Sequence, residues 1–388
     1  MQGIIPYDIL RYNLTYLYEM RVLMKIGIWG AGFVAHTHTE AIKGEGVEIF
    51  AVVDNDLQQA AEFANKWGIA HFGSDPAILL GDDISVVHVC TPPVFHYDMV
   101  LKLLDAGKHI LCEKPLCLDN EQADELARRA NEKRVVCAVN FNVRFHQACK
   151  KAVEIVSTPD FGSVYLIHGS YMQEFHALPA WSGWRYDPEL AGKMRAVTEI
   201  GSHWMDIAQC ISGKRITHVS AILRNFNPTR KLEDGIMHAI GADNSDDKTD
   251  ELSSCLVNVT SEDAATVNFR FEDGAIGTAL FSEISHGRIN RLSLEVTGAN
   301  NSLWWNSEEN NLLHTATKDS GVNTQVFAFG NGFTDTFRDL IRAFYADVRV
   351  GVMPENPIYP SFDEGANIVR LCNAVYESAQ NDACWVEV

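Results

Sequence analysis

The chain has 388 residues, of which 46% are hydrophobic, and this is enough to form the cores of two domains. It carries 32 Lys and Arg residues against 51 Asp and Glu residues, so its formal net charge is −19. Such an acidic surface argues against nucleic acids and anionic membranes as partners, because both are negatively charged. No stretch approaches the roughly 20 apolar residues that a membrane-spanning helix requires.

Residues 1–23 precede the first predicted strand and have no place in the fold that follows. Charged residues from Asp8 to Arg21 interrupt any apolar core, which argues against a signal peptide. We therefore expect an N-terminal extension, with Met20 or Met24 as the functional start. The nine cysteines form no C-x-x-C pair, and several lie within apolar runs. Reduced, buried thiols are the expected state, which favours a cytoplasmic location.

Strand-like and helix-like segments alternate from Lys25 to about Asn142. Apolar runs rich in Val and Ile predict buried parallel strands at 25–29, 47–53, 86–90, 109–112 and 135–140. Helices are predicted between them, near 33–43, 57–67, 95–106 and 120–133. This alternation predicts an α/β fold with a doubly wound parallel sheet, a Rossmann domain, over residues 24–143.

The first predicted strand runs into a glycine-rich turn, Gly30–Ala35 (G-A-G-F-V-A), at the start of the first helix. Gly30 permits the tight turn, and Gly32 lets the backbone approach a pyrophosphate without an intervening Cβ. The first helical turn, with Phe33 and Val34, offers free N–H groups and a partial positive charge to the phosphates. In this strand–turn–helix context the pattern predicts a dinucleotide-binding site.

Asp54 ends the second predicted strand, 22 positions after Gly32 (54 − 32). This is close to the roughly 20-residue offset at which an acidic residue meets the adenosine ribose hydroxyls. Its carboxylate would repel a 2′-phosphate, and neither Asn55 nor Asp56 supplies a cation for that phosphate. We therefore predict NAD as the cofactor in preference to NADP.

After a helical linker near residues 144–156 the pattern changes to successive strands separated by turns. These strands are predicted at 163–175, 216–226, 254–260, 264–271, 275–284, 291–297 and 302–305. They indicate a second α/β domain over residues 144–388, built on a large, mostly antiparallel open sheet. We expect one face to be covered by helices near 197–211, 333–349 and 363–380, and the other to pack on a second subunit. The densest acidic run, residues 243–251, is expected to be a solvated loop.

Three further clusters carry residues suited to chemistry. One predicted strand ends in a Thr-Pro-Pro loop that begins at Thr91, and the next ends in Glu113-Lys114-Pro115. Open α/β sheets bind their ligands at such carboxyl ends of parallel strands. The third cluster contains Glu199 and His203, whose spacing of four places both side chains on one face of a helix.

Together with the glycine turn, these clusters resemble the Gfo/Idh/MocA family, which includes glucose–fructose oxidoreductase and inositol dehydrogenase. The resemblance extends from Met24 to the C-terminus, and the E-K-P element is its most specific mark. It implies a pyridine-nucleotide domain followed by an α/β domain with a large open sheet. It further implies a sugar or polyol substrate, and a homodimer or homotetramer formed through that sheet.

By this resemblance Lys114 corresponds to the family's active-site lysine and His203 to its catalytic histidine. An ammonium group stabilises charge on a reacting oxygen, and a neutral imidazole can take a hydroxyl proton. Glu199 stands where the family usually has Asp, so its role stays open. Spacing alone would favour an ordinary amphipathic helix with a solvated Glu–His pair. A zinc site at Glu199 and His203 lacks a third ligand at a recognisable spacing, so no metal is predicted.

Further site residues follow from the same resemblance. Cofactor contacts are predicted for Thr91, Pro92, Pro93, His96, Glu113 and Lys114. His96 has the alternative of simply starting the next helix. Substrate contacts are predicted for Asn142, Arg144, Trp184 and Arg185. A structural ion pair is the alternative for Arg144, and ordinary aromatic packing is the alternative for Trp184.

We therefore expect an NAD(H)-dependent dehydrogenase that transfers hydride between a secondary hydroxyl of a sugar or polyol and nicotinamide. One alternative is an NAD-assisted glycosidase or lyase that oxidises and re-reduces its sugar, which would give product without net NADH. A second alternative is a nucleotide-binding regulator without catalysis, against which the presence of both Lys114 and His203 argues.

Overall fold

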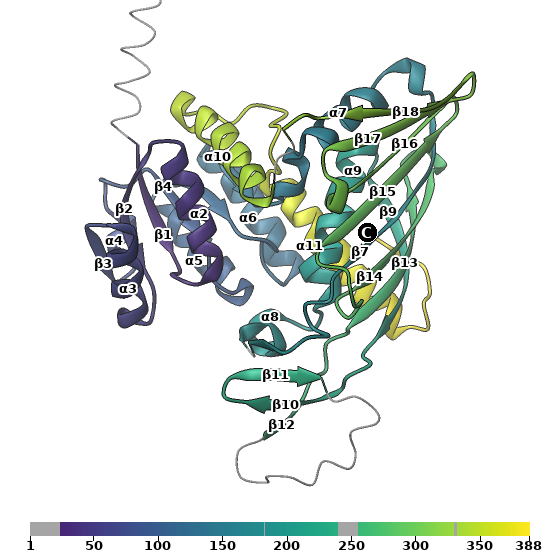
Figure 1. Ribbon diagram of the computed structural model, residues 1–388. Helices are drawn as coiled ribbons and strands as arrows, with labels where there is room; N and C mark the ends of the chain where they lie inside the picture. The colour runs from purple at the N-terminus through teal and green to yellow at the C-terminus, as the bar shows by residue number, and fades with distance from the viewer. Residues whose placement is uncertain (1–23, 182, 240–254, 330–331) are drawn as a thin grey trace, which may run out of the picture.

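The computed structural model describes residues 24–181, 183–239, 255–329 and 332–388. The expected N-terminal extension (1–23) and the acidic run (243–251) lie outside these residues. In the part of the chain that the structure describes, no helix has the length and apolar character needed to cross a membrane. Figure 1 shows two large sheets on opposite sides of a layer of helices.

The first sheet is the predicted Rossmann sheet, with six parallel strands in the order β3-β2-β1-β4-β5-β6. Its strands are β1 (Lys25–Trp29), β2 (Glu48–Val53), β3 (His71–Gly73), β4 (Val86–Val89), β5 (His109–Cys112) and β6 (Cys137–Val139). The helices between them are α2 (Phe33–Gly44), α3 (Leu57–Trp67), α4 (Ala77–Leu80), α5 (His96–Asp105) and α6 (Asn120–Lys133). The strand order reverses between β1 and β4, and nucleotides bind doubly wound sheets at this crevice.

The second sheet is the predicted open sheet, with nine strands in the order β18-β17-β16-β15-β7-β14-β13-β9-β19. They are β7 (Val164–Met172), β9 (Ile216–Arg224), β13 (Ala264–Phe271), β14 (Ile276–Ser282), β15 (Arg291–Gly298), β16 (Asn301–Asn306), β17 (Leu312–Thr317), β18 (Ser320–Val326) and β19 (Val386–Glu387). Within it, β7 pairs with β14 in parallel, and the other neighbours pair antiparallel. Alternate residues of β13 are buried, as in a sheet with one covered face.

The strand predicted at 254–260 does not belong to the large sheet. It is β12 (Cys255–Asn258), which lies in a separate four-stranded sheet with the order β12-β10-β11-β8. The other members are β8 (Ala180–Trp181), β10 (Thr229–Glu233) and β11 (Ile236–Ala239). This small sheet lies at the lower end of the molecule in Figure 1.

The helix predicted at 333–349 is α10 (Phe333–Val350), and it does not cover the large sheet as expected. It packs on α2 instead (Figure 1). Its buried side chains Phe337, Leu340 and Phe344 share a core with Ile26 and Ile28 of β1. Both faces of a parallel sheet must be covered, and α10 supplies part of this cover beside α2.

The two remaining predicted helices do contact the large sheet. The first consists of a π-helical turn (Val197–Gly201) and α9 (Ser202–Ser212), and α9 contacts β7 and β15. The second is α11 (Phe362–Gln380), which packs on β9 and, with its other side, on α6 and β6. The predicted linker helix is α7 (Gln147–Val156), which follows a 3-10 turn at Asn142–Phe145.

Arg144, one of the predicted substrate residues, is held in ion pairs between helices. Its Nε and Nη2 donate to the two carboxylate oxygens of Asp206 at 2.8 and 2.5 Å, and its Nη1 donates to Glu364 at 2.8 Å. Asp206 lies on α9 and is 1% exposed, while Glu364 lies in the first turn of α11. This geometry corrects the substrate assignment, because the bidentate fork joins three segments of the fold.

We expect Arg144→Met to lower the free energy of unfolding by about 3–5 kcal/mol, because it leaves Asp206 buried without its partner. The double variant Arg144→Met/Asp206→Leu should recover most of this loss. Arg128→Met is the matched control, since its pair with Glu132 is 58% exposed on both sides and should contribute at most about 1 kcal/mol. Urea denaturation measures all three. A raised substrate KM with unchanged stability would instead return Arg144 to the substrate site.

Candidate active site

The glycine turn lies at the carboxyl end of β1. Gly30 has a φ of +101°, and a Cβ there would lie 2.8 Å from the carbonyl oxygen of Cys90. Gly32 faces open space, since a Cβ built on it would meet nothing within 4 Å. Gly32 is also the N-cap of α2, and no side chain caps this helix. The N–H groups of its first turn, at Phe33 and Val34, are therefore available to a pyrophosphate.

Asp54 lies directly beside this turn. Its Oδ2 accepts a hydrogen bond from the N–H of Ala31 at 2.7 Å, and its Oδ1 accepts one from the N–H of Asp56 at 3.0 Å. A carboxylate oxygen has room for a further donor, so Asp54 can also receive ribose hydroxyls. The open cradle at Gly32 and the carboxylate at Asp54 fit the adenosine and pyrophosphate parts of NAD.

His96 lies behind the Thr-Pro-Pro and E-K-P loops and is fully buried. Its Nδ1 is 2.9 Å from the carbonyl oxygen of Pro115, and its Nε2 is 2.8 Å from that of Thr91. Both ring nitrogens are thus occupied in joining the two loops, and the contact of His96 with the cofactor stays a prediction. Thr91 and Pro92 are partly exposed and Pro93 is buried, so the first two are better placed to meet a cofactor.

The side chain of Glu113 is also bonded within the protein. Its Oε1 is 2.9 Å from His38 Nε2 and accepts a hydrogen bond from Asn140 Nδ2 at 2.6 Å. Its Oε2 accepts the backbone N–H of Lys114 at 3.1 Å. Only 8% of Glu113 is exposed, so its side chain faces the protein interior, and a cofactor contact of this residue stays a prediction. The carboxylate holds the E-K-P loop from within the protein.

A chain of hydrogen bonds continues from Glu113 to α10. His38 Nδ1 lies 2.9 Å from His88 Nδ1, and His88 Nε2 lies 2.9 Å from the hydroxyl of Tyr345. A carboxylate can only accept, so His38 Nε2 carries a proton. Burial keeps the pKa of His88 well below its usual value, so this ring is neutral. The contacts from Glu113 through His38 and His88 to Tyr345 thus form one continuous chain of buried polar groups.

The hydrogen-bond donors around Glu113 explain its charge. Burial opposes ionisation, but the hydrogen bonds from His38 and Asn140 outweigh it and lower the pKa of Glu113 below its ordinary value. Glu113 is therefore a buried anion directly before Lys114 in the chain.

Lys114 reaches from the E-K-P loop to the π-helical turn. The peptide bond that joins it to Pro115 is cis. Its Nζ donates to the carbonyl oxygen of Glu199 at 3.0 Å and lies 3.7 Å from Glu199 Oε2. The side chain is 13% exposed. The predicted helix thus begins with a π turn where Lys114 meets it, and such turns are frequent at functional sites.

The carboxylate of Glu199 binds cations. Arg185 Nε donates to Glu199 Oε2 at 3.1 Å, and the guanidinium of Arg185 lies 4.6 Å from the ring centre of Trp184. Burial would raise the pKa of Glu199, but Lys114 and Arg185 outweigh it and hold the pKa at about 2.

Three sequence-based assignments change with this geometry. Arg185, predicted to bind substrate, is an ion-pair partner of Glu199, and Trp184 lies against that Arg185 side chain. Among the hydrogen bonds of the described residues, none joins Glu199 to His203, so Glu199 does not orient the histidine directly. The expected solvated Glu–His pair is also absent from this helix, because Glu199 is 17% exposed and its partners are Lys114 and Arg185.

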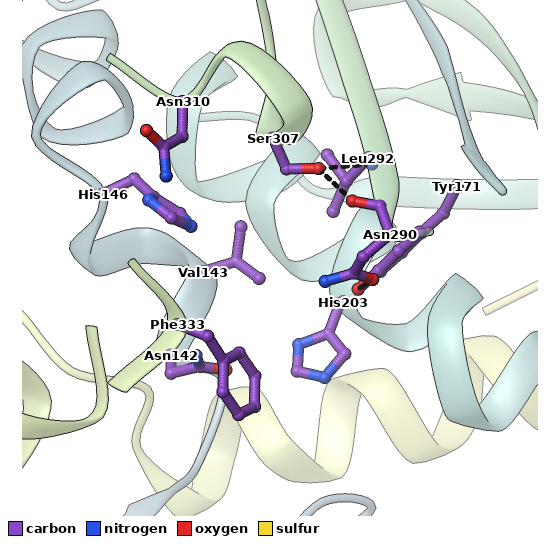
Figure 2. A pocket seen from close by; sticks show the side chains of 10 residues that line it. All are labelled: Asn142, Val143, His146, Tyr171, His203, Asn290, Leu292, Ser307, Asn310 and Phe333. Atoms are coloured by element: carbon purple, nitrogen blue, oxygen red, sulfur yellow. Dashed lines mark hydrogen bonds between the residues drawn. The ribbon is translucent and has the colours of Figure 1, made fainter. Parts of the chain in front are cut away.

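His203 lines a cavity of about 90 Å³ (Figure 2). Burial, and then the nearby ammonium of Lys114, lower the pKa of His203 to about 3, so its imidazole is neutral. Its Nδ1 is buried and has no hydrogen-bond partner. Lys114 also bonds to the carbonyl oxygen of Glu199, one helical turn before His203, so it reaches the same end of this helix.

The cavity lies between the turn that follows β6, strands β7 and β15 of the large sheet, and helices α9 and α10. It is lined by Asn142, Val143, His146, Tyr171, His203, Asn290, Leu292, Ser307, Asn310 and Phe333 (Figure 2). Of these, the sequence pointed to Asn142 and His203, and Asn142 Nδ2 donates to Thr336 Oγ1 at 2.7 Å. The others were missed because they come from strands, loops and α10 without a motif; their polarity near predicted strand ends was the one available signal. In the described ranges, no cluster of three or more His, Cys, Asp or Glu side chains could hold a metal ion.

Comparisons with known proteins agree with this architecture. A model described as an oxidoreductase family with an NAD-binding Rossmann fold matches residues 24–141, and the C-terminal α/β domain of the oxidoreductase family matches residues 153–388. Levoglucosan dehydrogenase of Pseudarthrobacter phenanthrenivorans is 26% identical over 395 residues, covering 94% of this chain and 98% of that protein. D-glucoside 3-dehydrogenase of Escherichia coli is 34% identical over 194 residues, covering 49% of this chain and 54% of that protein.

A solved structure of levoglucosan dehydrogenase in complex with NADH has a TM-score of 0.82 to this chain at 26% identity. The similarity covers 94% of this chain and 99% of the solved one. The C-terminal family model alone spans more than half of the sequence, and the Rossmann model precedes it. The protein is therefore an NAD-binding oxidoreductase and belongs to the Gfo/Idh/MocA family.

Proposed function

We propose that the protein is an NAD(H)-dependent dehydrogenase acting on a secondary hydroxyl of a sugar or polyol, or on the matching ketone. The observation that carries the proposal is a buried, neutral His203 that lines the cavity, with the Lys114 ammonium bonded to the carbonyl oxygen of Glu199 one helical turn earlier. Two relatives support a carbohydrate substrate, since their names state levoglucosan and a D-glucoside as what they oxidise.

Each residue has a role that its surroundings allow. His203 takes the proton from the substrate hydroxyl oxygen, because its imidazole is neutral and can accept it. Lys114, held by the backbone oxygen of Glu199, donates a hydrogen bond to that oxygen as negative charge develops on it. Glu199 holds Lys114 in place through its backbone oxygen and its carboxylate. The bound NAD supplies the hydride acceptor.

Assembly and location remain proposals. The outward face of the large sheet exposes Ile222 (62%), Ile276 (58%) and Leu280 (36%), and an apolar face of this kind suits burial against a second copy. A homodimer or homotetramer through this face is the form we propose. Six of the described cysteines are buried free thiols, which supports a reducing compartment such as the cytoplasm.

We expect the protein to form NADH from NAD with members of a panel of neutral sugars and polyols, followed at the NADH absorbance. NADP in place of NAD should give lower rates, because the Asp54 carboxylate repels a 2′-phosphate. Product release without net NADH would indicate an NAD-assisted glycosidase or lyase. NAD binding with no turnover of any compound would indicate a regulator.

We expect Lys114→Ala to lower kcat by about 10²- to 10⁴-fold, the usual contribution of a group that assists proton and charge movement. The Kd for NAD should stay close to that of the wild type, because the glycine turn and Asp54 are untouched. Lys102→Ala, at an exposed lysine on α5, is the matched control and should keep full activity. Survival of turnover in Lys114→Ala would remove Lys114 from the mechanism.

We expect kcat/KM at saturating NAD to stay constant between about pH 5 and 7, where a histidine with an ordinary pKa near 6.5 would protonate and stop working as a base. The pKa of His203 is about 3, so its neutral form persists throughout this range and is lost only at lower pH. In Lys114→Ala the pKa should rise but stay below 6.5, because burial remains; NMR titration of the ring measures it. An acid limb near pH 6.5 in the wild type would contradict this assignment.

A further inference from the structure

Asn290, which directly precedes β15, has a carboxamide whose orientation is fixed. Its Oδ1 accepts hydrogen bonds from the Tyr171 hydroxyl at 2.8 Å and from Gln173 Nε2 at 2.7 Å. An amide oxygen has two lone pairs, so both are used. The side-chain NH₂ of Asn290 is what remains for the cavity, and Figure 2 shows this side chain reaching into the cavity on the side of His203.

The backbone of Asn290 is held as well. Ser307 Oγ donates to the carbonyl oxygen of Asn290 at 2.5 Å and accepts the N–H of Leu292 at 2.8 Å (Figure 2). Ser307 therefore fixes the backbone on either side of residue 291 at the cavity wall. A donor fixed at both its backbone and its amide loses little freedom when a ligand binds, which favours recognition by hydrogen bonding.

A second polar atom at the cavity points to a ligand. His203 Nδ1 is buried without a hydrogen-bond partner, and buried polar atoms in native proteins are normally bonded. The amide of Asn142, by contrast, is already used by Thr336. The cavity thus combines a fixed amide donor at Asn290 with an imidazole whose Nδ1 lacks a partner.

The lining of the cavity is uncharged. Its ten residues are amides, imidazoles, hydroxyls and apolar side chains, and none is Asp, Glu, Lys or Arg. The two neighbouring cations, Lys114 and Arg185, are balanced by two carboxylates: both contact Glu199, and Lys114 also lies near the Glu113 anion. A carboxylate or phosphate on the substrate would lose its hydration without gaining a counter-charge, which is costly.

We propose that Asn290 determines specificity: its NH₂ group binds the oxygen on the carbon next to the one oxidised, in an uncharged polyhydroxylated substrate. This inference rests on the proposed dehydrogenase function and names the substrate class of that site. His203 and Lys114 hold the reacting hydroxyl, and Asn290 holds its neighbour. Two fixed oxygens orient the carbon that loses hydride.

The test uses the neutral sugar or polyol that the wild type oxidises fastest in the panel, and the analogue lacking the neighbouring hydroxyl. We expect Asn290→Asp, which keeps an oxygen for Tyr171 and Gln173 but replaces the donor by an acceptor, to lower kcat/KM about 10- to 100-fold on the hydroxylated substrate. Asn290→Ala should turn over both compounds equally, whereas the wild type prefers the hydroxylated one. Asn323→Asp makes the same change at an exposed position on β18, outside the cavity lining, and should keep the wild-type preference.

The wild type should also prefer the neutral sugar over its uronate and its phosphate ester. Preference for either anion would overturn the inference. So would a result in which both Asn290 variants keep the wild-type kcat/KM and the wild-type preference for the hydroxylated compound over its analogue. An unchanged Kd for NAD and unchanged thermal unfolding establish that the variants are folded. Failure of the wild type to form NADH from any compound would count against the proposed dehydrogenase function itself, which separates the two outcomes.

Discussion

The buried carboxylate of Glu113 is the constraint on which the site depends. A charge without partners inside a protein costs on the order of several kcal/mol, so the surrounding fold has to supply donors. These come from His38 on α2, from Asn140 after β6, and from the backbone N–H of Lys114. One anion therefore joins α2, the E-K-P loop that carries Lys114, and the end of β6. Through His88 the same chain reaches Tyr345 on α10.

Charge balance at Lys114 links the second sheet to this arrangement. Glu199 accepts the lysine's hydrogen bond through its backbone and balances its charge through its carboxylate, which Arg185 also binds. Glu in place of the family's usual Asp is consistent with this double duty, since one carboxylate here meets two cations. The lysine in turn disfavours protonation of His203. The charge of Lys114 thus helps to keep the His203 imidazole neutral, the form that can accept a proton.

The sequence predicted best those helices and strands whose ends are marked by residues close by in the chain. The ranges 25–29, 57–67 and 120–133 agree with β1, α3 and α6, and the two helices begin at capping residues Asp56 and Asp119. Ion pairs between residues far apart in the chain could not be predicted. Arg144 binds carboxylates 62 and 220 positions away, and no sequence spacing indicates such pairs. The apolar side of α10 likewise predicts that the helix packs against another element, but it does not indicate which sheet this is. The short β3 and the exposed β18 lack the buried alternation that marks a strand.

The position of α10 limits how the molecule can move. Its first residue, Phe333, lines the cavity, and the same helix lies along α2 and the β1 core. Moving Phe333 out of the cavity wall would disturb the packing of α10 on α2 and on the β1 core. A ligand in the cavity at Phe333 would therefore affect α2, the helix that follows the glycine turn, through the rigid helix α10.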